Sequence, residues 1–463
     1  MTLFLESPEK TQFHTHTHTL SLSHMLYRST QSVLLRVTAT TKRLYTVVRT
    51  TEDVEVEELF LDSVYEKLRR YVVEENSTTT PVIELRSPDE LHRLFEEHAT
   101  SLEIGKDSVD EEKLLKSVDL LLKYSVKTSH PLFLNQLYSR ADPVGIAADW
   151  ISTATNTNAH TFEVAPVYTL IERSLIRKIS SVIGGRFDSA KTEGLFVPGG
   201  SISNLYGMHL ARHRADPEIA KRGAVNGPRL VAFTSDQSHY SYLKSSRLTG
   251  LGSDNLIEVP SDENGRMCPE QLEKAVIRAK ESNYVPFFCG STAGTTVLGA
   301  YDPFDRVNEI CQRHEMWHHV DACWGGGAML LPDSDQFVKG LNQADSVSWN
   351  PHKMSGAPLQ CSTFLTRHDG ILKSANASSA AYLFQPDKLF ADMDTGDKTI
   401  QCGRKTDMLK LWMMWKSKGD KGMAQSVQKC FDLAQYTADM IRESSNFELA
   451  YEPSCANVCF WYV

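Results

Sequence analysis

The feature that most constrains the fold of this chain is the alternation of short apolar runs with helical patterns in its middle part. The predicted strands are 229–234, 285–289, 317–321 and 346–349, and the predicted helices among them are 271–281 and 304–314. Strands separated by helices form βαβ units, so we expect an α/β fold with a largely parallel sheet that helices cover on both faces. Ligands of such sheets bind at the carboxyl ends of the strands.

The segment before this sheet is predicted to be helical. Apolar residues recur at helical intervals over 52–72 and again over 110–125. Between these patterns, Ser87 can cap a helix that has a proline at its first position and Glu90 closing a capping box. No strand pattern precedes His130, so we expect a helical module here.

The first 52 residues differ in composition from the rest of the chain. No Asp or Glu occurs between Lys10 and Thr51, whereas basic residues, Ser and Thr are frequent. This composition resembles a mitochondrial import segment, but a disordered and dispensable tail is the interpretation we favour. The alternating His14, His16 and His18 have no nearby residue that completes a metal site, so no metal is expected.

Charge, hydropathy and cysteine content exclude several classes of protein. The net charge of −9 argues against non-specific binding of nucleic acid. No stretch approaches the roughly 20 apolar residues that cross a bilayer. None of the nine cysteines belongs to a C-x-x-C pair, which suits a reducing compartment. We therefore expect a cytoplasmic protein without a membrane span.

The last part of the chain is predicted to begin with a long helix from Leu409 and to end in a strand at 457–463. That strand is apolar on both faces, and a strand of this kind needs neighbours in a sheet and cover on both sides. We expect Phe460 or Trp461 to be open to solvent at an unpaired edge. We also expect the intact protein to continue beyond Val463.

Three polar residues lie at or just after the carboxyl ends of predicted strands. Lys353 comes after the strand 346–349, where partial desolvation lowers the pKa of an amine and favours Schiff-base formation. Asp321 ends the strand 317–321, where a carboxylate can pair with the pyridine nitrogen of pyridoxal phosphate (PLP). His239 follows the strand 229–234 and can stack on a planar cofactor.

A glycine turn completes this set. The segment Pro198-Gly199-Gly200-Ser201-Ile202-Ser203-Asn204 opens a helix, and glycines with hydroxyls at a helix N-terminus form a phosphate cradle. Taken singly, each feature has a simpler interpretation: a surface lysine, a capping or metal-binding aspartate, a core histidine and an ordinary turn. Together they favour one cofactor that all of them face.

Seven motifs occur in the order and spacing of a known family. They are P-G-G-S-I-S-N, H-Y-S, T-A-G-T-T-V-L-G-A, H-V-D-A-x-W-G-G, A-D-S-V-S-W-N-P-H-K, Y-L-F-Q-P-D-K and D-T-G-D-K-x-I-Q-C-G-R-K. The set resembles the PLP-dependent decarboxylases of acidic amino acids, which include glutamate, cysteine sulfinic acid and animal aspartate 1-decarboxylases. The resemblance covers residues 53–463, and the joint match is specific in a way that no single motif is.

The resemblance implies PLP as cofactor, the PLP-dependent transferase fold type I, and a homodimer with the active site at its interface. It divides the chain into a tail (1–52), a helical N-terminal module (53–133), a PLP-binding large domain (134–411) and the truncated start of a small C-terminal α/β domain (412–463).

The resemblance also implies roles for individual residues. Lys353 carries the cofactor, Asp321 pairs with the pyridine nitrogen, and His239 stacks on the ring. Tyr382, on a mobile loop, returns a proton to the α-carbon after CO2 leaves. The other cofactor-binding positions are Ser203, Asn350 and His352 on the phosphate side, with Thr296 and Cys323 beside the ring. The substrate positions are Asn135, Gln136 and Tyr138.

The implied reaction is α-decarboxylation of a small acidic amino acid. The segments 292–296 and 356–360 most resemble the enzymes that make hypotaurine from cysteine sulfinate and β-alanine from aspartate. The bulk of Tyr138 also favours these shorter substrates. Glutamate decarboxylation to GABA is the alternative, because the segment 156–158 resembles that enzyme. A catalytically silent homologue is the second alternative.

Overall fold

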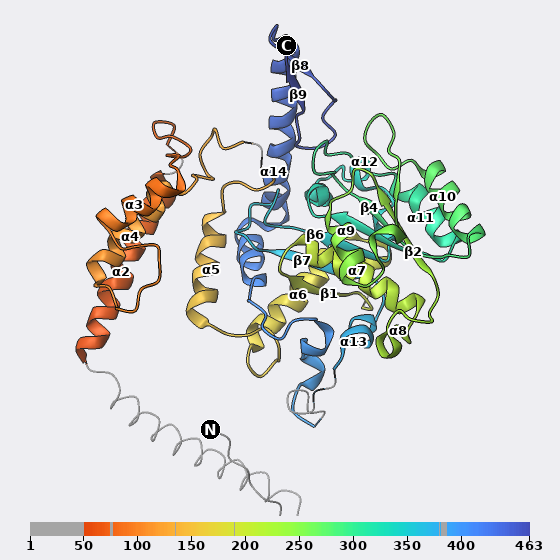
Figure 1. Ribbon diagram of the computed structural model, residues 1–463, viewed down its shortest axis with the longest axis horizontal. Helices are drawn as coiled ribbons and strands as arrows, with labels where there is room; N and C mark the ends of the chain where they lie inside the picture. The colour runs from red at the N-terminus through yellow and green to blue at the C-terminus, as the bar shows by residue number, and fades with distance from the viewer. Residues whose placement is uncertain (1–50, 75–76, 135, 189, 379, 381–386) are drawn as a thin grey trace, which may run out of the picture. The chain divides into compact units, whose positions relative to one another are not determined.

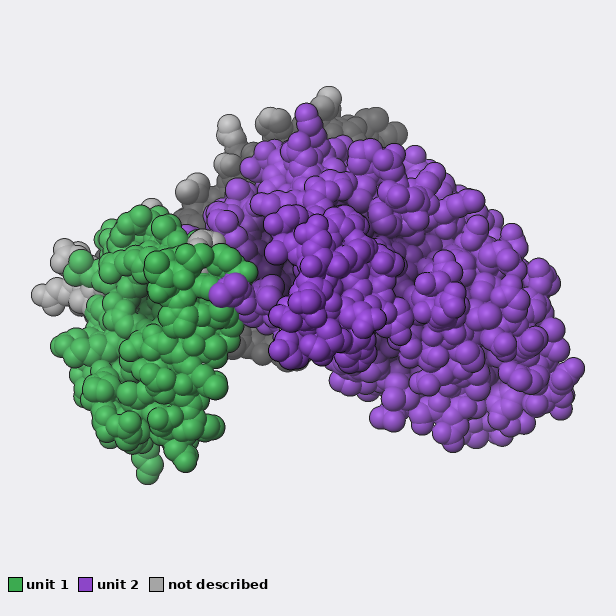
Figure 2. Space-filling view, turned by 90° about the horizontal axis from the view of Figure 1, so that it is seen from above, with its two compact units in different colours: residues 1–131 green, residues 132–463 purple. Residues whose placement is uncertain are grey.

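The computed structural model describes residues 51–74, 77–134, 136–188, 190–378, 380 and 387–463. The tail with His14, His16 and His18 lies outside these residues. The chain forms two compact units, Met1–Pro131 and Leu132–Val463, which Figure 2 shows in two colours. Within the described residues, no helix is both long enough and apolar enough to cross a membrane.

A seven-stranded sheet forms the centre of the second unit (Figure 1). Its strands are β1 Glu193–Val197, β2 Leu230–Ser235, β3 Leu256–Val259, β4 Val285–Thr292, β5 Trp317–Ala322, β6 Ser346–Trp349 and β7 Ser362–Thr366. They lie in the order β1-β7-β6-β5-β4-β2-β3. The strands from β3 to β6 in this order pair in parallel, and β7 runs antiparallel to both of its neighbours. The predicted largely parallel sheet is confirmed.

All four predicted strands are present as β2, β4, β5 and β6, and both predicted helices are present as α10 Pro269–Glu281 and α11 Phe304–Arg313. The other three strands have weak sequence signals. Strand β3 has only four residues, and β1 contains Glu193 and Gly194. Strand β7 includes two threonines and a serine, yet all five of its residues are buried. Its burial comes from the layers packed on it and not from its own composition.

The other α-helices of this unit are α5 Pro143–Thr155, α6 Pro166–Ile183, α7 Gly200–Ala215, α8 Ile219–Arg222, α9 Ser241–Leu248, α12 Asp335–Val338, α13 Ile371–Asn376 and α14 Met408–Glu443. Its 3-10 turns are Gly185–Phe187, Ser253–Asn255, Gly325–Leu330, Leu341–Gln343, Ala391–Met393 and Gly396–Lys398.

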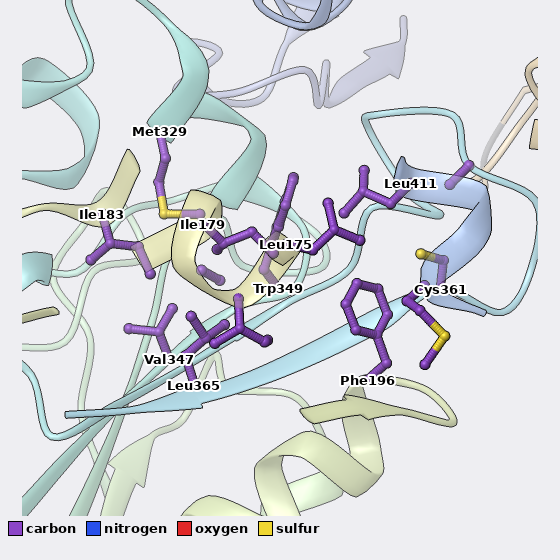
Figure 3. Close-up of a cluster of buried hydrophobic side chains, with 14 of the residues drawn as sticks. Leu175, Ile179, Ile183, Phe196, Met329, Val347, Trp349, Cys361, Leu365 and Leu411 are labelled. Carbon is purple, nitrogen blue, oxygen red and sulfur yellow. The ribbon is translucent and has the colours of Figure 1, made fainter. Parts of the chain in front are cut away.

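Helices cover both faces of the sheet. On one face, Leu175 of α6 packs in one cluster with Val347 of β6 and Leu365 of β7 (Figure 3). On the other face, Phe364 of β7 packs with Tyr206 of α7. Because successive residues of a strand point to opposite faces, Phe364 and Leu365 attach the sheet to two different helical layers.

The first unit consists of α2 Thr51–Glu74, α3 Pro88–His98 and α4 Glu111–Tyr124. The predicted capping box of α3 is confirmed. The backbone N–H of Glu90 donates to Ser87 Oγ at 3.3 Å, and the backbone N–H of Ser87 donates to the Glu90 carboxylate at 2.9 Å. Among the described residues of this unit, Phe95 and Ala99 are the buried apolar side chains. These three helices therefore have hardly any core of their own.

The chain ends with a long helix and a small hairpin. Helix α14 begins at Met408, close to the predicted start, and Gly419 at a φ of 63° interrupts it. Strand β8 Phe447–Leu449 pairs antiparallel with β9 Phe460–Tyr462. The prediction of one strand over 457–463 is wrong in length, because β9 covers only Phe460–Tyr462. The segment before it packs elsewhere, and the Asn457 side chain donates to the carbonyl of Thr296 at 3.1 Å. The predicted exposure is confirmed, since Trp461 is 65% exposed.

Candidate active site

The carboxyl ends of β4, β5 and β6 meet at one edge of the sheet. Thr292 ends β4 opposite Asp321 of β5, and Asp321 in turn lies opposite Ser348 of β6. A cavity of about 210 Å³ opens at this edge, and both Asp321 and Lys353 line it. The structure thus brings together the two groups that the sequence places on one cofactor. A larger cavity of about 630 Å³ lies beside α6, and none of the predicted site residues that the structure describes lines it.

Asp321 is a buried carboxylate held by neutral donors. Its Oδ1 accepts the backbone N–H of Cys323 at 3.0 Å, and its Oδ2 accepts Nδ2 of Asn204 at 2.6 Å. Burial by itself would raise the pKa of this carboxyl. The charge of Lys353 and the hydrogen bonds outweigh that effect and hold the pKa of Asp321 below its usual value. Asp321 is therefore ionised at neutral pH.

The loop after β6 supplies Asn350, His352 and Lys353, and all three line the cavity. Asn350 is buried, and its Oδ1 has no hydrogen-bond partner in the described part of the chain. The Nδ1 of His352 lies 2.7 Å from the carbonyl oxygen of Cys361. Burial lowers the pKa of His352 to about 4, so its ring is neutral at pH 7. This loop therefore presents an amine, an amide oxygen in need of a donor and a neutral imidazole.

The glycine turn before α7 forms another wall of the cavity. Gly200 and Ser201 line it, and Gly199 has a φ of 99°, which favours glycine. A Cβ on Gly200 would collide with Sγ of Cys323 and would lie 2.8 Å from Nδ2 of Asn350. Glycine at this position therefore keeps the space beside the helix N-terminus open.

Ser203, which the sequence places on the phosphate side, does not line the cavity. Its side chain is fully buried, and its Oγ donates to the carbonyl oxygen of Thr363 at 2.9 Å. Ser201, two residues earlier, does line the cavity. Successive helical residues are rotated by about 100°, so the two serines point to nearly opposite sides of α7. Ser201 is therefore the better placed hydroxyl for a phosphate.

His239, Thr296 and Cys323 all line the cavity. His239 Nδ1 accepts the backbone N–H of Ser241 at 3.2 Å, and burial lowers the pKa of His239, which keeps the ring neutral. Thr296 lies at the exposed rim. Burial raises the pKa of the Cys323 thiol, and the nearby Asp321 charge raises it further, so Cys323 is a protonated thiol.

The predicted substrate positions that the structure describes, Gln136 and Tyr138, do not line this cavity. Gln136 is exposed, and the Tyr138 ring is half-buried at 6.0 Å from the Phe133 ring, measured between centroids. Asn135 and Tyr382 lie outside the described residues. Among the described residues, most of the predicted cofactor positions line the cavity, and Gln136 and Tyr138 do not.

Sequence reasoning missed several residues that the structure places at the cavity, above all Asn204 and Thr292. Thr292 Oγ1 is buried and has no hydrogen-bond partner among the residues described. Asn204 contacts Asp321 directly. A signal for Asn204 was present, because it follows Gly200 by four residues and so shares that face of the helix.

These residues fit PLP. The N-terminus of α7 and the glycine turn favour a phosphate group, and the ionised Asp321 suits a protonated pyridine nitrogen. The half-buried Lys353 supplies an amine for the aldehyde. Asn350 Oδ1 and Thr292 Oγ1 are buried polar atoms that a ligand can satisfy.

Comparisons of the sequence with known proteins identify its family. Residues 88–463 match the pyridoxal-dependent decarboxylase conserved domain. The chain is 42% identical to acidic amino acid decarboxylase GADL1 of Xenopus tropicalis over 409 residues, which cover 88% of this chain and 78% of that protein. It is also 42% identical to cysteine sulfinic acid decarboxylase of Mus musculus over 414 residues, which cover 89% and 82% of the two chains.

Solved structures share the fold. The crystal structure of mouse CSAD matches with a TM-score of 0.85 and 41% identity, over 89% of this chain and 84% of that one. The structure of Oryza sativa TDC with PLP and tryptamine matches with a TM-score of 0.80, and its 23% identity over 89% and 84% of the chains shows the fold alone. The predicted fold type I is confirmed. The chain belongs to the pyridoxal-dependent decarboxylase family, and it is a lyase with pyridoxal phosphate as cofactor.

Proposed function

We propose that this member of the pyridoxal-dependent decarboxylase family removes the α-carboxylate of cysteine sulfinate, of aspartate or of both. The observation that carries the proposal is the 42% identity to two relatives named for acidic amino acid and cysteine sulfinic acid decarboxylation. The products would be hypotaurine and β-alanine. Glutamate is the alternative substrate, because a pocket separates substrates that differ by one methylene by only about 1–3 kcal/mol.

The cavity residues divide the binding of the cofactor among them. Lys353 carries it through its amine, and the N-terminus of α7 with Gly200 and Ser201 holds the phosphate. Asn350 and His352 would hold the cofactor on its phosphate side, and Thr296 and Cys323 would contact its ring. When bound, PLP supplies an electron sink for the electron pair that CO2 leaves on the α-carbon.

Three side chains then control charge and protons. The ionised Asp321 would keep the ring nitrogen protonated, and the neutral ring of His239 would stack on the cofactor. Tyr382 donates a proton to the α-carbon after CO2 leaves, acting as a general acid. This assignment of Tyr382 rests on its Y-L-F-Q-P-D-K sequence context.

A cytoplasmic homodimer with the active site at its interface is also part of the proposal. The helices of the first unit need an external surface to cover them, since Phe95 and Ala99 are the apolar side chains buried in its described part. In the second unit, Val167 and Leu170 of α6 are 63% and 50% exposed. Gln136 is exposed on its own chain, which leaves it available to the site of a second copy.

Release of labelled CO2 tests the function. Cysteine sulfinate, aspartate and glutamate, each labelled in the α-carboxylate, are supplied separately to the PLP-loaded protein, and Lys353→Ala serves as the blank. We expect faster release from the first two than from glutamate. Release from glutamate alone would favour the alternative substrate. PLP bound to Lys353 with no release from any of the three would favour a catalytically silent homologue.

A further inference from the structure

A line of buried polar side chains leads away from Asp321 along one face of the sheet. Trp317, His319 and Asp321 alternate along β5 and therefore point to the same face. Ser346 of β6 is paired with His319 in register, and Asn204 belongs to α7 on that face. All five side chains are at most 4% exposed. A buried polar line of this kind is stable when each donor meets an acceptor.

The side chains contact one another in sequence. Trp317 Nε1 donates to Ser346 Oγ at 2.8 Å, and Ser346 Oγ lies 2.8 Å from His319 Nδ1. His319 Nε2 lies 3.0 Å from Oδ1 of Asn204. Asn204 Nδ2 then donates to Asp321 Oδ2 at 2.6 Å. We call these four residues before Asp321 the β5 hydrogen-bond chain.

The groups at the two ends of the β5 hydrogen-bond chain set the direction in which its hydrogen bonds are donated. An indole can only donate, and an ionised carboxylate can only accept. Because Ser346 Oγ accepts from Trp317, its own proton is available to Nδ1 of His319. Burial lowers the pKa of His319 to about 3, so its ring is neutral and carries one proton, which then lies on Nε2. That proton is donated to Oδ1 of Asn204, and the amide nitrogen of Asn204 is left facing Asp321.

The opposite arrangement of protons would place two hydrogen-bond acceptors in contact. With the proton on Nδ1, His319 Nε2 would be an acceptor 3.0 Å from the acceptor Oδ1 of Asn204. Rotating the Asn204 amide would remove that conflict but would set its oxygen against the Asp321 carboxylate. Ser348 is compatible with the first direction, because its Oγ donates to Asn204 Oδ1 at 3.0 Å and can accept the Nε2 proton of His319, which lies 3.1 Å away. One proton arrangement therefore satisfies every contact.

We propose that Trp317, Ser346, His319 and Asn204 are positioning residues that orient the Asp321 carboxylate toward the ring nitrogen of the cofactor. They act through Asp321, and this inference rests on the role proposed for that residue. Because the indole at one end can only donate, the orientation of the amide at the other end is determined before the cofactor arrives.

His318 provides a matched control on the same strand. It is fully buried like His319, and burial lowers its pKa to about 4. Its Nε2 lies 2.7 Å from Ser291 Oγ and its Nδ1 lies 3.3 Å from Asn308 Oδ1. Neither of these partners lines the cavity. His318→Gln and His319→Gln are thus the same change at equal burial, and only one of them reaches the site.

The test uses apo forms of His319→Gln, His318→Gln and Asp321→Asn. Each is titrated with PLP, its absorbance spectrum with PLP is recorded at pH 7, and its thermal unfolding is followed. We expect His319→Gln to weaken PLP binding about tenfold, which is about 1.4 kcal/mol, and to shift the cofactor band in the same direction as Asp321→Asn. The two histidine variants should lose similar thermal stability. His318→Gln should leave PLP affinity and the cofactor band unchanged.

Two results would separate this inference from the role of Asp321. Suppose that Asp321→Asn shifts the cofactor band and that His319→Gln changes neither the band nor the affinity for PLP. The β5 hydrogen-bond chain then does not position the Asp321 carboxylate, although Asp321 keeps its role. If Asp321→Asn leaves the band unchanged, the role of Asp321 itself is wrong. Ser346→Ala and Ser291→Ala repeat the comparison should the histidine variants not fold. Each removes one fully buried hydroxyl beside a β5 histidine, and equal site effects from the two would overturn the proposal.

Discussion

Two buried aspartates lie at opposite edges of the same sheet, and the protein holds them in different ways. Asp345 immediately precedes β6 at the amino edge, whereas Asp321 lies near the carboxyl end of β5. Their side chains are equally inaccessible, since Asp345 is 5% exposed and Asp321 is 4% exposed. Burial therefore does not distinguish the two sites, and the charge of their partners does.

Asp345 is surrounded by two arginines and a histidine. Its Oδ1 lies 2.5 Å from Arg367, 2.6 Å from His368 and 3.4 Å from Arg214, and its Oδ2 accepts the backbone N–H of His318 at 2.8 Å. Burial would raise the pKa of Asp345, but His368 and the two arginines lower it to about 2. The protein's own side chains thus hold this carboxylate ionised without any ligand.

Asp321 accepts hydrogen bonds from two neutral groups, the Cys323 backbone and the Asn204 amide. No ion pair joins it to a basic side chain among the residues that the structure describes, and the charge of Lys353 acts on it from across the cavity. A buried carboxylate with neutral partners can still receive a cationic ligand group, whereas one that is already paired cannot. The partner charge thus separates the candidate functional aspartate from the structural one.

The largest expected effect comes from removing the cation that faces Asp321. We expect Lys353→Ala to lower CO2 release by about a thousandfold or more, because the amine that carries the cofactor is gone. Lys398→Ala is the control, since Lys398 pairs at 2.7 Å with Glu193, which does not line this cavity. Near-normal turnover by Lys353→Ala would contradict the cofactor assignment.

Asp321→Asn tests the carboxylate that lines the same cavity. We expect this variant to bind PLP and to lose about a hundredfold in the rate of CO2 release, because a neutral amide cannot keep the ring nitrogen protonated. The single-turnover rate of CO2 release and the fraction of bound PLP measure the two effects separately. Unchanged turnover with full PLP occupancy would show that Asp321 has no part in the chemistry.

Asp345→Asn should have the opposite profile. We expect it to lower the free energy of unfolding by about 3 kcal/mol, because Arg367 and Arg214 lose their counter-charge and His368 loses a charged hydrogen-bond partner. The absorbance spectrum of bound PLP should not change. Urea unfolding measures the loss of stability, and the absorbance spectrum of the same sample shows whether the PLP site has changed. A shifted PLP band with unchanged stability would reverse the assignment of the two aspartates.

The parts of the fold that sequence predicts are those set by local pattern. Short runs with apolar residues at 317, 320, 347 and 349 predicted the strands β5 and β6, and that prediction placed Asp321 and Lys353 at the ends of neighbouring strands. Strand β7 has no such pattern, since its burial depends on helices that come from distant parts of the chain. The boundaries at residues 53, 134 and 412 stay predictions.

The finer details of the site depend on how helix α7 is rotated and on contacts between residues that lie far apart in the sequence. Whether Ser201 or Ser203 faces the cavity is decided by the rotation of α7 against β7, which the glycine turn alone does not reveal. Asn204 resembles an ordinary helical amide, and its role depends on His319, which lies 115 residues away. Gln136 is exposed and does not line the cavity of its own chain, so the role proposed for it depends on a second copy, which one sequence cannot place.

The smallest expected effect is the pH dependence of stability that Asp345 contributes. Its pKa falls from an ordinary value of 3.8 to about 2 on folding. A carboxyl whose pKa is lowered on folding stabilises the fold above its unfolded pKa, and that stabilisation is lost as the pH falls through the folded pKa. The shift corresponds to about 2 kcal/mol, which is present at pH 5 and disappears between about pH 4 and pH 2.

Many other groups titrate in the same range, so the useful quantity is the difference in free energy of unfolding between the wild type and Asp345→Asn. Carboxyls common to both proteins cancel in this difference, and the contribution of Asp345 remains. We expect urea unfolding to give a constant difference from pH 7 to pH 5 and a difference smaller by about 2 kcal/mol near pH 2. A difference independent of pH would mean that the cations around Asp345 do not hold it ionised. The contrast with Asp321 would then have to rest on hydrogen-bond geometry and not on charge.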